Sequence, residues 1–252
     1  MGSNVGLALL LSTLAGLSTT VGSILGLFVR KPGMRFLSLS LGFSAGVMIL
    51  LSFMELLAGG IQAVGFGPAY VAFFGGMLVM FALDVVIPHH YMAEHAVASD
   101  GQGVLFRTGL LVALGIGVHN LPEGMATLAG TLQDVSLGMA IALAIALHNI
   151  PEGLAVSMPI HAATGSRRMA FLFSFLAGIA EPVGAALAAV VLLPFLNGAV
   201  LGLLLSAVAG IMVFISLDEL VPVSRSFGEA HLSIIGVLMG MAAMVLSLGL
   251  IM

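Results

Sequence analysis

Residues 119–124 read His-Asn-Leu-Pro-Glu-Gly, and residues 148–153 read His-Asn-Ile-Pro-Glu-Gly, so one polar phrase occurs twice, 29 positions apart. Both copies lie inside long apolar stretches. Ionisable side chains at membrane depth are costly and mark functional sites by default. Two copies of one polar cluster in the most apolar part of the chain predict a partner that compensates them, and a metal cation is the natural candidate.

The chain around this motif is too apolar for a water-soluble protein. Of its 252 residues, 60% are hydrophobic and 7% are charged, and the mean hydropathy is +1.23. A stretch of about twenty apolar residues can cross a bilayer. Eight such stretches predict an all-α membrane protein with a single domain over residues 1–252. We expect its helices at about 5–29, 36–58, 68–87, 105–130, 134–161, 169–193, 197–222 and 230–251.

The positive charges fall on one side of this predicted membrane topology. All seven Lys and Arg residues lie in alternate links: Arg30, Lys31 and Arg35, then Arg107, then Arg167 and Arg168, and finally Arg225. Cytoplasmic loops carry an excess of Lys and Arg. We therefore expect these links in the cytoplasm, both termini outside it, and the chain in the lipid bilayer of the bacterial inner membrane.

Composition also limits the partners. The chain has no cysteine, which excludes disulfides, thiolate metal sites and iron–sulfur clusters. Its net charge of −4 is spread through the membrane spans, so nucleic acid is not expected as a partner. The sequence leaves the oligomeric state open, a homodimer included.

Helical spacing places the ligands of each motif copy on one face. Residues i and i+4 are neighbours on a helix, so His119 lies beside Glu123, and His148 lies beside Glu152. Each helix offers one imidazole and one carboxylate. The two helices follow one another and run antiparallel, so the copies form an inverted pair, which is typical of transporters.

Three further residues extend the predicted centre. Asn120 and Asn149 point about 100° away from the His–Glu face, toward a second site that the glutamates bridge. Glu181 adds a carboxylate within the next apolar span. Pro122 and Pro151 each remove an amide donor, so we expect kinked helices and a loosened backbone at the site.

The second apolar span adds Met48 and Glu55, which share a helical stripe with Ser52. We include both Met48 and Glu55 among the candidate metal residues. Several other polar residues keep open roles: Asp84, Asp218, Glu219, His89, His90, His95 and His161.

The repeated His-Asn-x-Pro-Glu-Gly, Ala-Glu-Pro at 180–182 and Asp-Glu-Leu-x-Pro at 218–222 resemble the ZIP (Zrt/Irt-like) family of metal transporters, its bacterial ZupT branch in particular. The resemblance implies a ZIP-type fold of eight helices, with both termini outside and metal movement into the cytoplasm. It implies a principal site of His119, Glu123, His148 and Glu152. It also implies a second site, completed by Asn120, Asn149 and Glu181.

Uptake of a divalent transition metal is therefore the leading hypothesis, with the metal as cargo. Imidazole and carboxylate without thiolate suit Zn²⁺ first, and also Fe²⁺, Mn²⁺, Co²⁺ and Cd²⁺. The alternative is an intramembrane metal-dependent hydrolase. The motif is not His-Glu-x-x-His and no Ser or Cys nucleophile is evident, so we expect no enzyme. An inert scaffold would leave the duplication unexplained.

Overall fold

A computed structural model describes residues 4–28, 34–86, 102–192, 195, 197–226 and 230–251, and every element in these ranges is helical. Five of the membrane spans are single helices: α1 (Val5–Phe28), α4 (Phe66–Val86), α6 (Gln102–Gln133), α7 (Val135–Thr164) and α8 (Arg167–Leu192). A sixth single helix, α11 (Ala230–Ile251), is the last span. The other two are composite: α2 (Met34–Leu51) with η2 (Ser52–Leu57) and α3 (Ala58–Val64), and α9 (Gly198–Ile215) with η4 (Ser216–Leu220) and α10 (Val221–Ser226).

These elements confirm the eight predicted spans and correct some of their ends. The second span reaches Val64 rather than residue 58, and the seventh reaches Ser226 rather than residue 222. The apolar pattern weakens at Gly59 and Gly60, but the helix continues until Gly65. Gly65 has φ of 84°, a left-handed conformation that ends the helix and favours glycine. Arg30, Lys31, His89, His90 and His95 lie outside the described residues.

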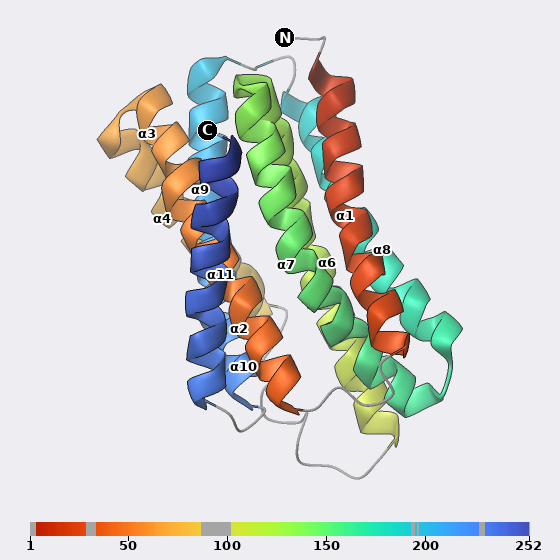
Figure 1. Cartoon of the computed structure of the whole chain (residues 1–252). Helices are drawn as coiled ribbons and strands as arrows, with labels where there is room; N and C mark the ends of the chain where they lie inside the picture. Colours follow the sequence, from red (N-terminus) through yellow and green to blue (C-terminus); the bar gives the residue numbers. More distant parts are fainter. Residues whose placement is uncertain are drawn as a thin grey trace.

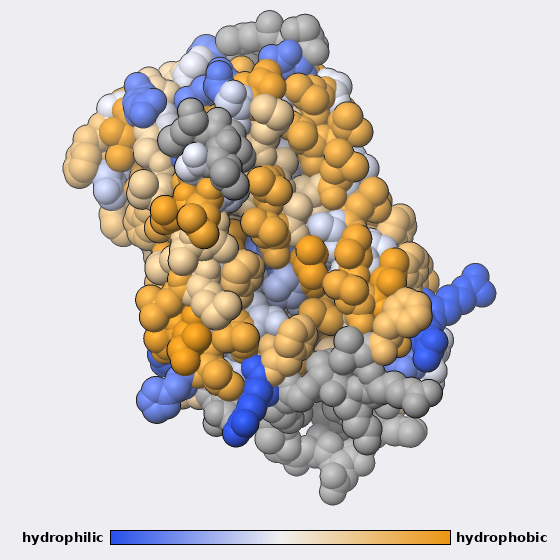
Figure 2. Space-filling model, in the orientation of Figure 1, coloured by the Kyte–Doolittle hydropathy of each residue, from blue (hydrophilic) through white to orange (hydrophobic). Residues whose placement is uncertain are grey.

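The surface fits a protein that crosses a membrane several times. In the described part of the chain, seven spans are long and apolar enough to do so. The eighth span, α6, is 32 residues long and carries the first motif copy. Figure 2 shows apolar side chains over most of one face, with hydrophilic ones toward its ends.

The helices form two groups that pack against each other. One group contains α1, α6, α7 and α8, and the other contains α2, α4, α9 and α11 with their short extensions. Figure 1 shows them side by side, with both chain termini at the same end. The described ends near Arg35, Arg167 and Arg225 lie at the opposite end, as the charge pattern predicted. The main seam between the groups is where α2 meets α7 and α9 meets α6.

Close glycine contacts reveal an internal symmetry in the first group. A Cβ at Gly22 of α1 would meet the Ile150 carbonyl of α7, and one at Gly184 of α8 would meet the Leu121 carbonyl of α6. The two contacts are equivalent by symmetry. Gly184 of α8 corresponds to Gly22 of α1 at an offset of 162 residues, and Ile150 of α7 corresponds to Leu121 of α6 at an offset of 29 residues. Backbones approach this closely in membranes only where side chains are small.

The second group repeats in the same way. A Cβ at Gly46 of α2 would meet the Val237 carbonyl of α11, and one at Gly210 of α9 would meet the Phe73 carbonyl of α4, an offset of 164 residues. Successive spans cross the membrane in opposite directions, and each repeat comes five spans after the original. Each span therefore runs in the direction opposite to its repeat. The molecule therefore consists of two inverted halves that meet at the α6–α7 pair.

The composite spans carry a matched irregularity. Both η2 and η4 are π-helical, and each begins at a serine whose hydroxyl donates to a methionine carbonyl four residues back: Ser52 to Met48 and Ser216 to Met212, each at 2.7 Å. Such π-turns often mark functional positions. By contrast, α6 and α7 stay α-helical through Pro122 and Pro151, and the kinks expected there stay a prediction.

Candidate metal centre

The two motif copies lie in the middle of the first helix group, where α6 and α7 pack together. The four His and Glu side chains of the motifs are at most 1% exposed. Close helix packing keeps them there, because Gly124 contacts α8 and Gly153 contacts α1 through backbone atoms. The sequence thus buries two imidazoles and two carboxylates at one depth.

Each histidine pairs with the glutamate of the other helix. His148 Nε2 lies 3.0 Å from Glu123 Oε1, and His119 Nε2 lies 3.5 Å from Glu152 Oε1. The i, i+4 spacing predicted a pair on each helix; the structure instead interleaves the two helices. Interleaving brings all four side chains to one point from two sides.

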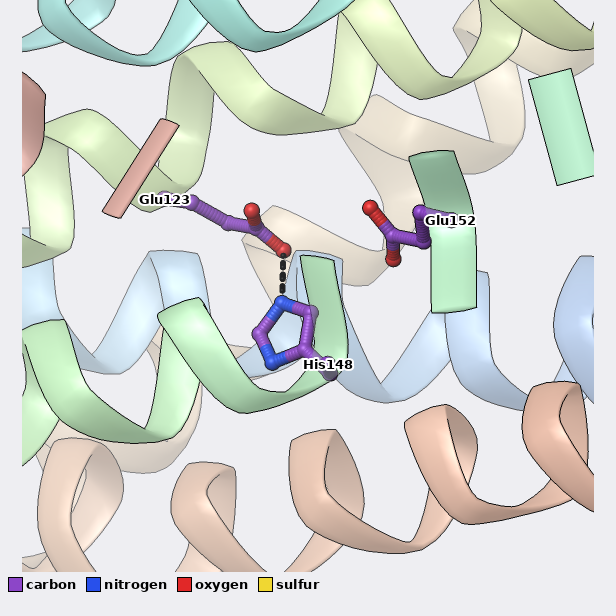
Figure 3. A group of neighbouring side chains, drawn as sticks. All are labelled: Glu123, His148 and Glu152. Atoms are coloured by element: carbon purple, nitrogen blue, oxygen red, sulfur yellow. Dashed lines mark hydrogen bonds and ion pairs between the residues drawn. The ribbon is translucent and has the colours of Figure 1, made fainter. Parts of the chain in front are cut away.

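Three of these residues form a compact group of donor atoms. One ligand atom each from Glu123, His148 and Glu152 lies within 4.8 Å of the others. Figure 3 shows the carboxylate of Glu152 facing that of Glu123, with the His148 ring bound to Glu123. Two carboxylates and an imidazole at this separation match the ligands that bind Zn²⁺.

Several donor atoms at this point lack a hydrogen-bond partner. They include Glu123 Oε2, Glu152 Oε2, His148 Nδ1 and both ring nitrogens of His119. A buried polar atom left unpaired costs about 1–3 kcal/mol. The hydrogen bonds and ion pairs within the group therefore leave several of its polar atoms without a partner. A scaffold whose polar residues serve only structure would not explain these unpaired atoms. A bound cation would satisfy several of them together.

A second set of polar groups lies beside the first, toward α8 and α1. Asn149 Nδ2 donates to Glu181 Oε2 at 2.9 Å and to the Ala15 carbonyl at 3.1 Å. Asn120 Nδ2 donates to the Ala177 carbonyl at 2.9 Å. These bonds fix both amide groups. The Oδ1 atoms of Asn120 and Asn149, and Oε1 of Glu181, have no hydrogen-bond partner in the structure and are oxygen acceptors.

Comparison with known proteins identifies the family. A family model described as ZIP Zinc transporter matches residues 88–248, more than half of the chain. The chain belongs to the ZIP family. A protein named zinc transporter ZupT from Chlorobium luteolum is 50% identical over 261 residues, covering 98% of both chains. The ZupT proteins of Nitratidesulfovibrio vulgaris (48% over 268 residues, 97% of both chains) and Oceanobacillus iheyensis (47% over 262 residues, 97% of this chain and 98% of the relative) are similar.

Family membership confirms two predictions. ZIP proteins are transporters rather than enzymes, so the hydrolase alternative is rejected. The all-helical structure with several apolar spans makes this ZIP protein a multi-pass membrane protein.

The two further predicted residues of this ZIP protein, Met48 and Glu55, lie in the second helix group. Met48 is fully buried on α2, and Glu55 is 9% exposed on η2. Neither belongs to the Glu123–His148–Glu152 group. Their roles as metal ligands stay predictions.

The remaining polar residues fall at the ends of the spans or near them. Asp84 and Glu219 are each 5% exposed in the second helix group. The His161 carbonyl accepts a hydrogen bond from the Gly165 amide at the end of α7.

Sequence reasoning missed Ser44 at this centre. Its hydroxyl, on α2, lies 3.2 Å from the His148 carbonyl oxygen and 3.5 Å from Glu152 Oε1. A signal was available, because Ser44 precedes Met48 by four residues and extends the stripe already recognised on that helix.

Proposed function

We propose that this ZIP transporter carries Zn²⁺ into the cytoplasm through a mid-membrane site formed by His119, Glu123, His148 and Glu152. The observation that supports the proposal most strongly is the buried Glu123–His148–Glu152 group, whose donor atoms lie within 4.8 Å of one another. The names of the relatives, which are zinc transporters, agree with this cargo.

The cargo extends to other transition metals in this proposal. Borderline metals accept mixed imidazole and carboxylate ligands, and selectivity among them comes from ligand type, geometry and metal availability rather than from raw affinity. Fe²⁺, Mn²⁺, Co²⁺ and Cd²⁺ are therefore further substrates. Mg²⁺ and Ca²⁺ prefer all-oxygen shells and are excluded by the two imidazoles.

A second cation binds to the oxygen ligands that lie next to the first metal site. Asn120, Asn149 and Glu181 supply this site, and the glutamates of the motifs bridge the two. Asn149 and Glu181 are already bonded at 2.9 Å, which supports a shared location. The three glutamates carry about −3 against +4 for two divalent ions, so the loaded centre is nearly neutral in a medium where isolated charge is costly.

Met48 and Glu55 serve as auxiliary ligands on the path to this centre. Met48 shares a face of α2 with Ser44, and the Ser44 hydroxyl reaches Glu152. Glu55 lies seven residues further along the same span, about 10 Å along the helix axis. A buried carboxylate at that distance marks a step between the membrane surface and the centre.

Orientation follows from the charges. With Arg35, Arg167 and Arg225 on the cytoplasmic side, both termini face outward, and the protein resides in the bacterial inner membrane. Transport toward the cytoplasm is then transport toward the arginine-bearing ends of the spans.

Zinc uptake into proteoliposomes tests the proposed site. His148→Ala and Glu152→Ala each remove a donor from the cluster, so we expect uptake to fall to the background of empty liposomes, with unchanged incorporation into the membrane. The matched control is His231→Ala, because His231 is an exposed histidine at the start of α11. Wild-type uptake by either cluster variant would refute the site.

A further inference from the structure

The contact of Ser44 crosses the seam between the two helix groups. Ser44 belongs to α2 in the second group, whereas His148 and Glu152 belong to α7 in the first. Its side chain is fully buried, with Oγ 3.2 Å from the His148 carbonyl oxygen and 3.5 Å from Glu152 Oε1. A residue outside the first group therefore touches a carboxylate of the centre.

The chemistry of this hydroxyl makes Glu152 the more consequential of the two acceptors. A serine hydroxyl has one hydrogen to donate. A backbone carbonyl inside a helix already accepts the amide four residues later. Glu152 Oε1 lies 3.5 Å from His119 Nε2, the same distance as from the Ser44 hydroxyl. A hydrogen bond to a charged acceptor is about twice as strong as one between neutral groups.

The internal symmetry supplies a comparison within the molecule. The offset of 164 residues that relates Gly46 to Gly210 relates Ser44 to Val208, which is buried and has no side-chain donor. Each His–Glu pair joins the two halves. The pair that contains Glu152, the carboxylate that Ser44 reaches, has a His119–Glu152 separation of 3.5 Å. The symmetry-related pair has a His148–Glu123 separation of 3.0 Å. The hydroxyl is thus found where the ion pair is longer.

We propose that Ser44 is a positioning residue that holds the Glu152 carboxylate away from His119 and so keeps both groups available to the cation. This inference rests on the proposed function. Without the hydroxyl, Glu152 closes on His119 as Glu123 closes on His148, and the cation must break a tighter ion pair in order to bind.

The test is the zinc affinity of the purified full-length Ser44→Ala variant, measured by calorimetry together with uptake kinetics in proteoliposomes. We expect the dissociation constant and the KM for Zn²⁺ to rise about three- to tenfold, which corresponds to the net strength of an ordinary hydrogen bond, because the bond from Ser44 to Glu152 is long, at 3.5 Å. The maximal uptake rate and the thermal midpoint should stay at wild-type values, because the loaded centre has the same ligands in both proteins.

Ser52→Ala is the matched control. Ser52 is equally buried on the same span, but its hydroxyl bonds to its own helix at Met48. We expect wild-type affinity for this variant.

The inference is overturned if Ser44→Ala changes the dissociation constant less than threefold. It is also overturned if Ser44→Ala and Ser52→Ala lower the zinc affinity, the maximal uptake rate and the thermal midpoint to the same extent. If His148→Ala and Glu152→Ala also bind zinc normally, the proposed site itself fails; if they lose zinc and Ser44→Ala does not, only the role of Ser44 fails.

Discussion

Substituting Gly153 by Ala tests how tightly the centre depends on helix packing. A Cβ at this position would meet the carbonyl oxygen and carbon of Thr19 and the amide nitrogen of Ser23, all of them backbone atoms of α1. Backbone atoms cannot rotate away, so α1 and α7 must separate. Overpacking of a tight interface costs about 1–3 kcal/mol, and the absence of a movable side chain places this site at about 3 kcal/mol.

Part of that cost is returned by helix propensity. Alanine is about 1 kcal/mol more favourable than glycine inside a helix, so the net loss in free energy of unfolding for Gly153→Ala is about 2 kcal/mol. Gly117→Ala is the control, because Gly117 lies two residues before His119 on α6 and an added Cβ there has only the Ala177 Cα at 3.9 Å nearby. The free energy of unfolding of Gly117→Ala should rise by up to about 1 kcal/mol.

The assay is thermal unfolding of both purified variants, followed by zinc binding. We expect a lower midpoint for Gly153→Ala and a midpoint equal to or above wild type for Gly117→Ala. Zinc affinity should fall only for Gly153→Ala, because Glu152 is the adjacent residue and moves with the displaced helix. Equal midpoints for the two variants would refute the packing argument.

Three further predictions concern the centre and its orientation. Glu181→Ala should reduce zinc uptake less than the loss of a principal ligand does, since it serves the second site; uptake as low as that of Glu152→Ala would contradict this division. An impermeant thiol reagent added outside intact cells should label Gly67→Cys and leave Ser166→Cys unlabelled, and the reverse pattern would invert the topology. Metal binding requires neutral imidazole and ionised carboxylate and therefore releases protons. Zinc affinity should thus weaken as the pH falls, and His119→Gln with His148→Gln should flatten this dependence; calorimetry that finds no proton release on binding would exclude a His and Glu site.

The sequence alone predicted the membrane spans because their signal is long and strong. The polar residues of the motif were predicted with similar ease, since a buried His or Glu stands out in an apolar span. The pairing of His148 with Glu123 was missed, because helical spacing describes neighbours on one helix and not the register between two. The π-turns at Ser52 and Ser216 were missed for a related reason: a serine bonded to its own helix has no distinctive spacing.

The inverted halves were only partly visible in the sequence. The two copies of residues 119–124 are nearly identical and adjacent, so the α6–α7 repeat was evident. The longer repeat survives in scattered identities at an offset of 164 residues, such as Gly46 with Gly210, Met48 with Met212 and Ser52 with Ser216. These become conspicuous only when the contacts of the helices are known. Ser44 was missed because a serine in a membrane helix most often bonds to its own backbone.

The inverted arrangement of the halves has a consequence for the direction of flow. A route built from one unit used twice, in opposite senses, offers a cation arriving from either face nearly the same succession of groups. The path itself therefore does not favour one direction of transport over the other. The symmetry is broken at two equivalent pairs of positions, where Glu181 corresponds to Thr19 and Ser44 corresponds to Val208. Such differences change the rates of metal transport in both directions and leave the equilibrium distribution of the metal unchanged. In the absence of a coupled ion, net flow stops when the electrochemical potential of the metal is equal on the two sides, and accumulation inside a cell then depends on the membrane potential and on the molecules that bind the metal once it arrives.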